Sequence, residues 1–416
     1  MAHLLVVESW VGAMSRLLPR SIAEAGHEFT FLTRNLDHYL RSWRGPGEHP
    51  LLGAKSVLTA ETNDPAAVRA AVERAHRDTP FDGVLSSCDY YLETAATLAR
   101  YLGLPGCDPA AVRRAHRKHV ARRVMADAGL PTPGYATAVT WADTARAAAE
   151  VGYPVVLKPV DLCAGMYVRR ADDEAGLRAA YGALAGFPVN ARGQERDATV
   201  LVEEFLVGPE VSVETVTVDG ATTVVGVTDK AITGATSFVE AGHAFPAPVP
   251  AADREAAVDL ALAALAALGV DRAVAHTEVK LTARGPYVVE VNLRPAGNSI
   301  TELVRRVTGV DLPGAYLDVV LGFDPDLTVR DTGVGGAAIA FLVPSRTGRV
   351  RAVTGADRPA DADVVEWQID VVAGQELVAT DDNNGYAGRV MTVADTPEAA
   401  AARAAALVGC IGIDYA

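Results

Sequence analysis

Apolar runs alternate with helical patterns over the first part of the chain. Buried-strand patterns stand at "HLLVVES", "HEFTFLTR" and "FDGVLSS", and helical patterns lie between them at residues 12–26 and 65–77. Strands that alternate with helices in this way predict a small parallel α/β domain over residues 1–108. The turn "ESWVGAM" after the first strand has one glycine and lacks G-x-G-x-x-G, so we expect this domain to hold substrate and not NAD.

Proline and glycine mark the next boundaries. Between "GLPGCDPAAV" and "AGLPTPGY" the pattern predicts one helix at about 109–128. A β-rich stretch follows from residue 135, and a larger α/β stretch continues to about 325. From "GVGGAAIAFLVPSRTGRV" onward, short strands, the turn "TDDNNGYAGRV" and a helix at 396–408 predict a separate C-terminal module. The fold class that we expect is therefore α/β and α+β, in several modules.

Charge and composition narrow the function classes. The 416 residues carry a net charge of −14 with no long basic block, so nucleic acid is not an expected partner. No apolar run approaches the roughly 20 residues of a membrane helix, and the N-terminus does not resemble a signal peptide, so we expect a cytoplasmic protein that does not bind membranes. The four cysteines are far apart, and we expect each to be reduced and buried: Cys88, Cys107, Cys163 and Cys410.

Lysine is scarce in this chain. Of 38 lysines and arginines, five are lysines: Lys55, Lys118, Lys158, Lys230 and Lys280. A composition that favours arginine elsewhere makes lysine more plausible where a compact, flexible charge is needed, as at a nucleotide phosphate. For Lys55 we expect an ordinary surface position.

The sequence "AVAHTEVKLTARGPYVVEVNLRP" predicts two strands joined by a three-residue loop, Ala283 to Gly285. Antiparallel pairing then sets three pairs opposite one another: Glu278 with Glu290, His276 with Asn292, and Lys280 with Val288.

Two carboxylates that face each other across a ladder repel, so Glu278 and Glu290 destabilise the hairpin unless a cation lies between them. Alternation puts Asn292 and Arg294 on the same face. Magnesium prefers hard oxygen ligands and takes a few carboxylates together with substrate phosphates. A solvated sheet face is the alternative, but the intervening residues are apolar. We therefore predict a metal site at Glu278, Glu290 and Asn292.

A nucleotide site is predicted upstream. "YPVVLKP" is an apolar strand that carries Lys158, and the loop "VDLCAGMYV" after it could close over phosphates, although a surface lysine explains the pattern too. "TVLVEEFLVGPEVSVETVTV" predicts a strand, a bend at Gly208-Pro209 and a second strand. Glu203 and Glu210 could meet the adenine amino group and the ribose hydroxyls. An exposed strand edge explains this pair equally well.

Taken together, these segments resemble the ATP-grasp superfamily over most of the chain. The resemblance implies five parts: an N-terminal α/β domain at 1–108, a linker helix at 109–134, an ATP lid at 135–205, a catalytic subdomain at 206–328 and a C-terminal lobe at 329–416. "VEEFLVGPE" is similar to the hinge of D-alanine–D-alanine ligases. That similarity implies an adenine contact at Glu203, backbone contacts at Phe205 and Leu206, and a ribose contact at Glu210.

The same resemblance implies ATP and magnesium as cofactors, with two metal ions and manganese as a substitute. It assigns Lys118 and Lys158 to the phosphates, and Glu278, Glu290 and Asn292 to the metal. Gly165 lies in the phosphate loop, which has fewer glycines than the family usually shows.

"SFVEAGHAFPAPV", "HTEVKL", "VEVNLRPAGNSI" and "DNNGYAGRVMTVADTPEAA" are similar to the L-amino acid ligases, including the bacilysin-type dipeptide ligases, and to carnosine-synthase-like enzymes. The similarity implies small-molecule carboxylate and amine substrates, namely amino acids, and a homodimer, which is common in the family. It implies substrate contacts at Glu240, His243, Arg294, Gly297 and Asn298. Arg294, Lys158 and His243 would be catalytic, although a satisfied loop histidine is the alternative for His243.

A carboxylate is a poor electrophile, so the implied reaction forms an acyl phosphate, which an amine attacks to give an amide, ADP and phosphate. No Ser/His/Asp or Cys/His arrangement stands out, in agreement with a reaction that needs no covalent nucleophile. Two alternatives stay open: an ATP-grasp carboxylase or ligase of nucleotide biosynthesis, and a non-catalytic nucleotide-binding module.

Overall fold

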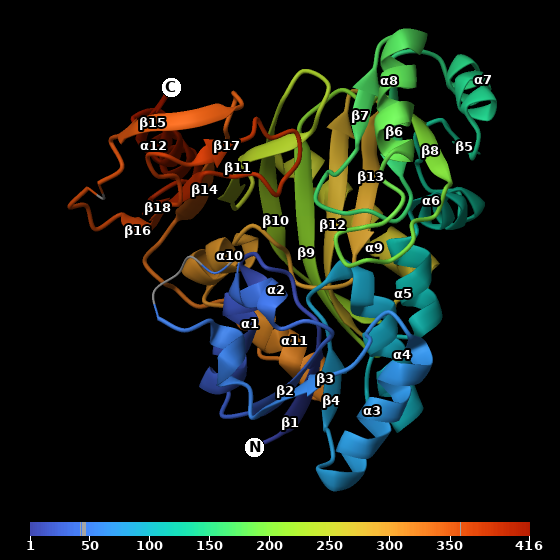
Figure 1. Cartoon of the computed structure of the whole chain (residues 1–416), viewed down its shortest axis with the longest axis vertical. Helices are drawn as coiled ribbons and strands as arrows, with labels where there is room; N and C mark the ends of the chain where they lie inside the picture. The colour runs from blue at the N-terminus through green and yellow to red at the C-terminus, as the bar shows by residue number, and fades with distance from the viewer. Residues whose placement is uncertain (42, 44–46, 358) are drawn as a thin grey trace.

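The structure is a computed structural model that describes residues 1–41, 43, 47–357 and 359–416 (Figure 1). Its N-terminal part is a four-stranded parallel sheet in the order β3-β2-β1-β4. The strands are β1 (His3–Val7), β2 (Glu28–Thr33), β3 (Ser56–Thr59) and β4 (Gly83–Leu85). The helices are α1 (Met14–Glu24), α2 (Asp37–Leu40), α3 (Pro65–Asp78) and α4 (Leu92–Leu102). The predicted parallel α/β arrangement is confirmed.

The single helix predicted at about 109–128 is wrong. It is two helices, α5 (Pro109–His116) and α6 (Lys118–Asp127), because Arg117 has an extended backbone with φ −84° and ψ 98°. The amide of Lys118 donates to the carbonyl of Val160 at 3.2 Å and not to a helical carbonyl. The break makes Lys118 the first residue of α6, where its side chain is buried.

Residues that follow form a second, antiparallel sheet in the order β5-β8-β6-β7. Its strands are β5 (Tyr135–Ala138), β6 (Val155–Pro159), β7 (Arg169–Ala171) and β8 (Val200–Glu204), and two helices accompany them, α7 (Trp141–Val151) and α8 (Glu174–Ala185). We call this unit the lid.

The largest sheet has eight strands in the order β13-β12-β9-β10-β11-β14-β18-β16, and every neighbouring pair is antiparallel. The strands are β9 (Glu210–Val218), β10 (Ala221–Thr233), β11 (Val239–Phe245), β12 (Ala273–Thr282), β13 (Gly285–Asn292), β14 (Gly336–Leu342), β16 (Val364–Ile369) and β18 (Gly388–Ala394). The C-terminal strands therefore extend this sheet and do not build a main sheet of their own. A small fourth sheet contains β15 (Gly348–Thr354), β17 (Glu376–Leu377) and β19 (Gly412–Tyr415).

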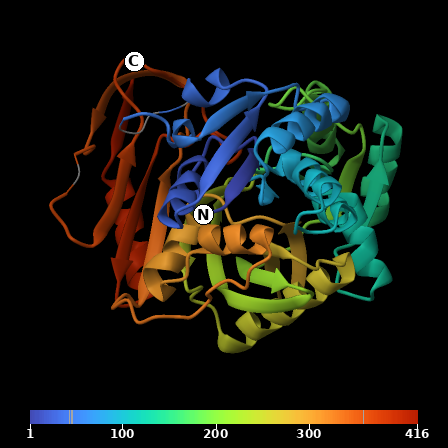
Figure 2. The same cartoon turned by 90° about the horizontal axis from the view of Figure 1, so that it is seen from below.

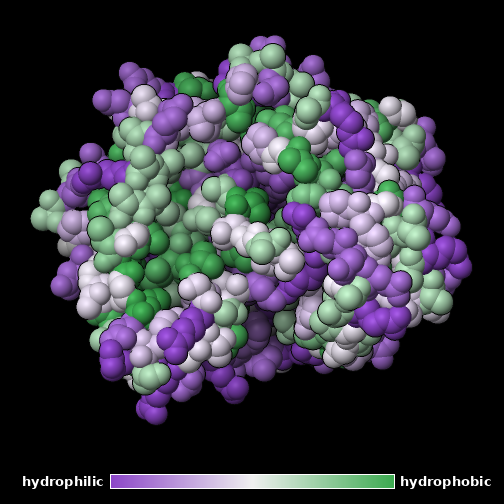
Figure 3. Space-filling model, turned by 90° about the horizontal axis from the view of Figure 1, so that it is seen from above, coloured by the Kyte–Doolittle hydropathy of each residue, from purple (hydrophilic) through white to green (hydrophobic). Residues whose placement is uncertain are grey.

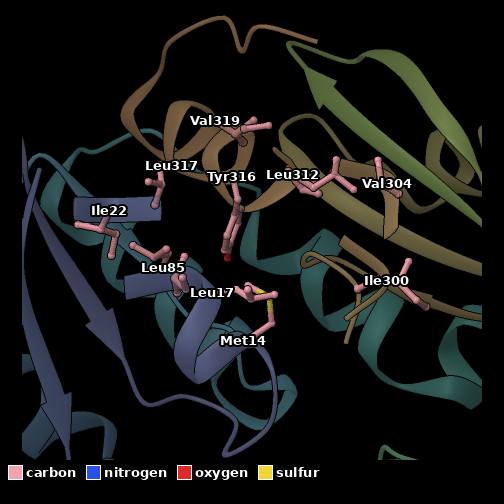
Figure 4. Close-up of a cluster of buried hydrophobic side chains, with 14 of the residues drawn as sticks. Met14, Leu17, Ile22, Leu85, Ile300, Val304, Leu312, Tyr316, Leu317 and Val319 are labelled. Carbon is pink, nitrogen blue, oxygen red and sulfur yellow. The ribbon is translucent and has the colours of Figure 1, made fainter. Parts of the chain in front are cut away.

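Four helices accompany the large sheet: α9 (Ala251–Leu268), α10 (Ile300–Thr308), α11 (Leu312–Leu321) and α12 (Pro397–Gly409). Seen from below, orange helices of the α10–α11 region lie between the blue N-terminal domain and the sheet (Figure 2). One hydrophobic cluster joins these parts, in which Met14 and Leu17 of α1 share a core with Ile300 of α10 and Tyr316 of α11 (Figure 4). The Tyr316 hydroxyl also donates to the carbonyl of Ser86 at 3.1 Å. The N-terminal domain is therefore fixed against the sheet by a shared core.

Apolar surface residues are concentrated on one side of the molecule (Figure 3). Seen from above, apolar residues gather mainly on the left, the side of the C-terminal strands in Figure 1 (Figure 3). No helix in the described part of the chain is long and apolar enough to cross a membrane.

The four cysteines are free thiols, and Cys88 and Cys163 are buried as expected. The expectation of burial was wrong for Cys107, which is half-buried, and for Cys410, which is exposed at the C-terminal cap of α12.

Candidate active site

A cavity of about 580 Å³ lies where the N-terminal domain, the lid and the large sheet meet. Fourteen of the residues predicted from the sequence line it: Lys118, Lys158, Gly165, Glu203, Phe205, Leu206, Glu210, Glu240, Glu278, Glu290, Asn292, Arg294, Gly297 and Asn298. His243 does not. The N-terminal domain contributes Trp10, Met14 and Asp89 to the cavity lining.

Lysines gather in this cavity. Lys118, Lys158, Lys230 and Lys280 all line it, whereas the side chain of Lys55 is 46% exposed and pairs with Glu28 at the surface. The four scarce lysines therefore lie together in one cavity, and Lys55 is the surface residue that we expected, while a contact between these lysines and phosphate stays a prediction. Each cavity lysine has a carboxylate partner, so the cavity is a network of paired charges.

The hairpin that carries the predicted metal ligands differs from expectation at its turn. Thr282 pairs with Gly285, so the strands are joined by a two-residue turn and not by three residues. Gly285 has φ +109°, a conformation that glycine adopts without strain. As a result Lys280 lies opposite Tyr287, and the prediction that it faces Val288 is wrong.

A β-bulge corrects this one-residue slip further along the hairpin. The register shifts between Glu278 and the next residue, which leaves Val289 as the extra residue of β13. Beyond the bulge, Glu278 faces Glu290 and His276 faces Asn292, and both of these predicted pairs are confirmed.

Arg122 of α6 explains how the bulge is tolerated. Its guanidinium donates to the carbonyls of Val288 and Val289 at 2.6 and 2.9 Å, so the irregular edge of β13 has hydrogen-bond partners. The same guanidinium pairs with Glu203, which also lies 2.5 Å from the amine of Lys158. Burial would raise the pKa of Glu203, but Arg122 and Lys158 outweigh it and lower the pKa to about 2.

Glu203 is therefore a buried ion-pair partner, 2% exposed, and not part of a solvated strand edge. Both of its carboxylate oxygens are occupied by cations. This arrangement favours a role in orienting Lys158 over the predicted contact with adenine.

Lys230 of β10 lies at the centre of the charged network. Its amine is 2.6 Å from Glu278, 3.1 Å from Glu240 and 3.3 Å from Glu210. Its side chain is 2% exposed. Burial would lower the pKa of Lys230, but the three carboxylates outweigh it and raise the pKa well above its usual value. Sequence reasoning noted this lysine but gave it no role.

Glu210 has a lysine on either side, because β9 lies between β10 and β12. Lys230 and Lys280 are its ladder partners, and the amine of Lys280 is 3.2 Å from its carboxylate. Glu210 is 8% exposed, so the alternative of an exposed edge is excluded for this residue as well.

The carboxylates of the hairpin each have a cation of their own. Glu290 pairs with the amine of Lys118 at 2.9 Å, and Glu278 pairs with Lys230. The described residues include no group of three or more His, Cys, Asp or Glu arranged to hold a metal ion. Glu278, Glu290 and Asn292 still offer hard oxygen donors on one wall, which suits magnesium when substrate phosphates complete the ligands.

His276 lines the cavity beside Glu278 and supports its carboxylate. Its Nδ1 atom lies 3.0 Å from Glu214 and its Nε2 atom lies 3.3 Å from Glu278. Burial disfavours the charged imidazole, but Glu214 and Glu278 outweigh it and raise the pKa of His276 to about 9. A charged imidazole between two carboxylates holds Glu278 in a fixed orientation. The motif "HTEVKL" contains this histidine, but its spacing alone does not reveal the partner on β9.

Glu240 and His243 of β11 form a pair that the sequence placed at the substrate. Glu240 lines the cavity, whereas His243 lies behind it with Nε2 3.1 Å from the Glu240 carboxylate. The ring of His243 packs edge-on against Phe341, and its side chain is fully buried. A direct contact between His243 and substrate is therefore not supported, and the alternative of a satisfied histidine fits only Nε2, because the buried Nδ1 atom has no hydrogen-bond partner among the described residues.

The loop before α10 brings Asn298 to Glu240. The Asn298 amide donates to the carboxylate that His243 and Lys230 also contact. Asn298 and Ser299 have φ of +48° and +63°, so the chain turns sharply here, and Gly297, Asn298 and Ser299 all line the cavity.

Arg294 follows β13, and its guanidinium forms a two-point pair with Asp89 of the N-terminal domain at 2.8 and 2.9 Å. Burial would lower the pKa of Arg294, but Asp89 outweighs it and raises the pKa. Asp89 occupies two of the N–H donors of this fork, while the side chain still lines the cavity, so the substrate contact expected at Arg294 stays a prediction. Asp89 was missed, since it lies 205 residues away in the sequence.

The predicted phosphate loop, residues 160–168, lies against the C-terminal part of the chain. The amide of Asn383 donates to the carbonyl of Ala164 at 2.9 Å, and Asn383 also accepts from the amide of Glu240 at 2.9 Å. Gly165 has φ +68° and lines the cavity. The loop therefore lies over the cavity, fastened by residues from beyond β14.

Three families match separate parts of the chain. The "ATP-grasp N-terminal domain" matches residues 22–106, the "ATP-grasp domain" matches residues 151–302, and the "L-amino acid ligase C-terminal domain 2" matches residues 340–416.

Three relatives match long stretches of the chain. The uncharacterized protein y4rH of Sinorhizobium fredii is 31% identical over 83% of this chain and 70% of its own length. Carnosine synthase 1 of Gallus gallus is 30% identical over 64% of this chain, and the alanine–anticapsin ligase of Bacillus subtilis is 27% identical over 59%. The match spans 30% of the former relative and 55% of the latter.

Solved structures share the whole fold. The L-amino acid ligase from Bacillus licheniformis superposes with a TM-score of 0.81 at 23% identity, covering 100% of this chain and 99% of that one. The biotin carboxylase domain of the Hydrogenobacter thermophilus 2-oxoglutarate carboxylase, solved with MgADP and bicarbonate, gives 0.71 at 17% identity, covering 99% of this chain and 90% of that one. From its two ATP-grasp matches the chain belongs to the ATP-grasp superfamily, and its C-terminal part matches the L-amino acid ligase C-terminal domain.

Proposed function

We propose that the protein is an ATP-dependent ligase that joins the carboxylate of an amino acid to an amine or a second amino acid through an acyl phosphate, releasing ADP and phosphate. The observation that carries this proposal is that one cavity is lined both by the residues assigned to ATP and by the residues assigned to an amino acid. The C-terminal match to L-amino acid ligases and the two ligase relatives support the choice of substrates.

At the nucleotide end, we assign Lys118 and Lys158 to the ATP phosphates and Glu210 to the ribose. Phe205 and Leu206 would offer backbone groups to the adenine. Buried lysines that are held by carboxylates keep their charge and their orientation without solvent reorganisation, which favours binding of a polyphosphate.

Magnesium would be held by the phosphate oxygens together with Glu278, Glu290 and Asn292. We propose that two ions bind there and that manganese can replace them. Bound magnesium would offset the negative charge of the transferred phosphoryl group. In this scheme Lys118, besides its contact with phosphate, and Lys230 also stabilise the hairpin. They keep the carboxylates paired when the metal is absent, so the hairpin is stable without it.

At the substrate end, Glu240 would face the ammonium group of an amino acid, oriented by Asn298 and by His243 from behind. The substrate carboxylate would attack the γ-phosphorus of ATP, and ADP would leave. The amine would then attack the acyl carbon, phosphate would leave and the amine would lose a proton. Arg294 would stabilise the charge on the acyl phosphate, and the loop over the cavity would exclude water.

An ADP-release screen across pairs of amino acids and simple amines, with mass spectrometry of the products, tests the proposal. We expect ADP together with a condensed amide for at least one pair. ADP release that requires bicarbonate or a nucleotide intermediate would replace the ligase by a carboxylase or a nucleotide-biosynthesis enzyme. ADP release with no partner of any class would leave the non-catalytic module.

A further inference from the structure

Resting on the proposed function, we propose that Asp89 is a positioning residue. It fixes the guanidinium of Arg294 at the acyl-phosphate end of the cavity, so the acyl site is complete only when the N-terminal domain is docked on the large sheet.

The first support is the geometry of the pair. The Nε and Nη2 atoms of Arg294 lie 2.8 and 2.9 Å from the two oxygens of Asp89, which is the fork arrangement that fixes both the place and the plane of a guanidinium. The side chains are 12% and 1% exposed. The indole of Trp10 donates to the same carboxylate at 2.8 Å, so Asp89 itself is held from a second side.

The second support is the rigidity of the turn that carries Asp89. It begins a short 3₁₀ helix, Asp89–Tyr91, separated by three residues from the edge strand β4, and the whole turn is buried. Tyr316 of α11 donates to the carbonyl of Ser86 in the same turn. Because the turn is bonded to elements of both domains, the position of the carboxylate is tied to the docking of the N-terminal domain.

The third support is that the pair with Asp89 leaves some N–H donors of Arg294 free. Arginine has five N–H donors. Two go to Asp89 and one goes from Nη1 to the carbonyl of Pro295 at 3.1 Å, while the side chain still lines the cavity. The remaining donors can therefore meet a substrate oxygen without breaking the fork. A phosphate in the cavity would meet an arginine whose orientation is already set.

The test is Asp89→Asn, which keeps the shape of the side chain and removes its charge. We expect kcat to fall by about 100-fold, because misplacement of a group by ~1 Å costs that much. The KM for ATP should stay near the wild-type value. In a double-mutant cycle, Asp89→Asn should add little to the loss caused by Arg294→Lys, because both changes remove the same interaction.

Glu302 provides a matched control, since it is a buried carboxylate that pairs with Arg305, Arg306 and Arg20 away from the cavity. Glu302→Gln should lower the melting temperature as much as Asp89→Asn while kcat stays near the wild-type value. Should Asp89→Asn fail to fold, Trp10→Phe removes one hydrogen bond to the carboxylate and should lower kcat less, in the same direction.

A second measurement does not depend on turnover. Calorimetry of inorganic phosphate binding to the ADP complex should show weaker phosphate binding in Asp89→Asn, by about tenfold, with ADP affinity unchanged. Wild-type kcat and phosphate affinity in both the Asp89 and Trp10 variants would overturn the positioning role. A wild-type protein that releases no ADP would instead overturn the proposed function, and phosphate binding would still decide the role of Asp89.

Discussion

Glu278 and Glu290 face each other across the β12–β13 ladder, yet each carboxylate is paired with a different lysine, Lys230 at 2.6 Å and Lys118 at 2.9 Å. The lysines offset the repulsion that like charges would otherwise cause across a ladder. From the sequence we expected that this repulsion would require a metal ion. The two lysines remove that requirement. What still favours magnesium is the set of hard oxygen donors on a wall that also carries the lysines assigned to phosphate.

Glu290→Gln should reduce turnover by about 100-fold or more, the scale expected when a group that offsets transition-state charge is lost. The fold should survive, because an amide can still accept a hydrogen bond from Lys118. Magnesium should raise the melting temperature of the wild type in the presence of ADP, and should do so less for the variant. Glu255→Gln on the exposed face of α9 is the control. Near-normal turnover in Glu290→Gln would remove this residue from the metal site.

Glu210→Ala should weaken ATP binding by the 1 to 3 kcal/mol typical of a lost charged hydrogen bond, or about 5- to 150-fold. Calorimetry with ATP and magnesium measures the change directly. Glu73→Ala on α3, far from the cavity, should leave the affinity as it is. An unchanged affinity in Glu210→Ala would place the ribose contact at another residue.

Glu240→Gln should raise the KM for one amino acid much more than the KM for ATP, because a buried ammonium would lose its countercharge. Steady-state kinetics with each substrate varied in turn separates the two effects. Since His243 contacts Glu240 and not the cavity, His243→Gln should cause a smaller change in the same KM. Amino acid KM values that stay constant in Glu240→Gln, with turnover supported by bicarbonate or a nucleotide, would favour the carboxylase alternative.

Glu203 links stability to acid pH. Its pKa is about 2 in the folded protein, below the ordinary glutamate value of 4.5, so its pairing with Arg122 and Lys158 stabilises the fold fully above pH 4.5. That contribution, about 3 kcal/mol at 1.36 kcal/mol per pKa unit, is lost as the pH falls from 4.5 through 2. Denaturant unfolding at pH 7 and pH 3 should show Glu203→Gln to be less stable at pH 7 and to lose less between the two. Parallel losses in both proteins would show that another carboxylate is responsible.

The sequence predicted the parts of the site that depend on local pattern. Alternation along β12 and β13 correctly placed Glu278 opposite Glu290, but through two compensating differences, a shorter turn and a bulge. The bulge in β13 could not be predicted, because its carbonyls accept hydrogen bonds from Arg122 of α6, which is far away in the sequence. The fold class followed from the order of strands and helices, whereas the break at Arg117 accompanies a hydrogen bond from the Lys118 amide to Val160 of the predicted phosphate loop.

The residues that sequence reasoning missed are those whose role comes from a distant partner. Asp89 acquires its meaning from Arg294, and His276 acquires it from Glu214 on the neighbouring strand. Lys230 was visible as one of few lysines, but its three carboxylate partners lie on three different strands. No short motif records such a set, because the sheet brings the members together only after the chain has folded.

The distribution of lysine has a practical consequence for chemical labelling. Lys55 is 46% exposed, whereas the other four lysine side chains are 2 to 13% exposed and held by carboxylates. Among the lysines, an amine-reactive dye or resin should therefore attach at Lys55, on the N-terminal domain and outside the cavity lining. A fluorophore at Lys55 leaves the cavity unmodified. Slower labelling of the four lysines in the cavity would report, residue by residue, whether the cavity is open or filled.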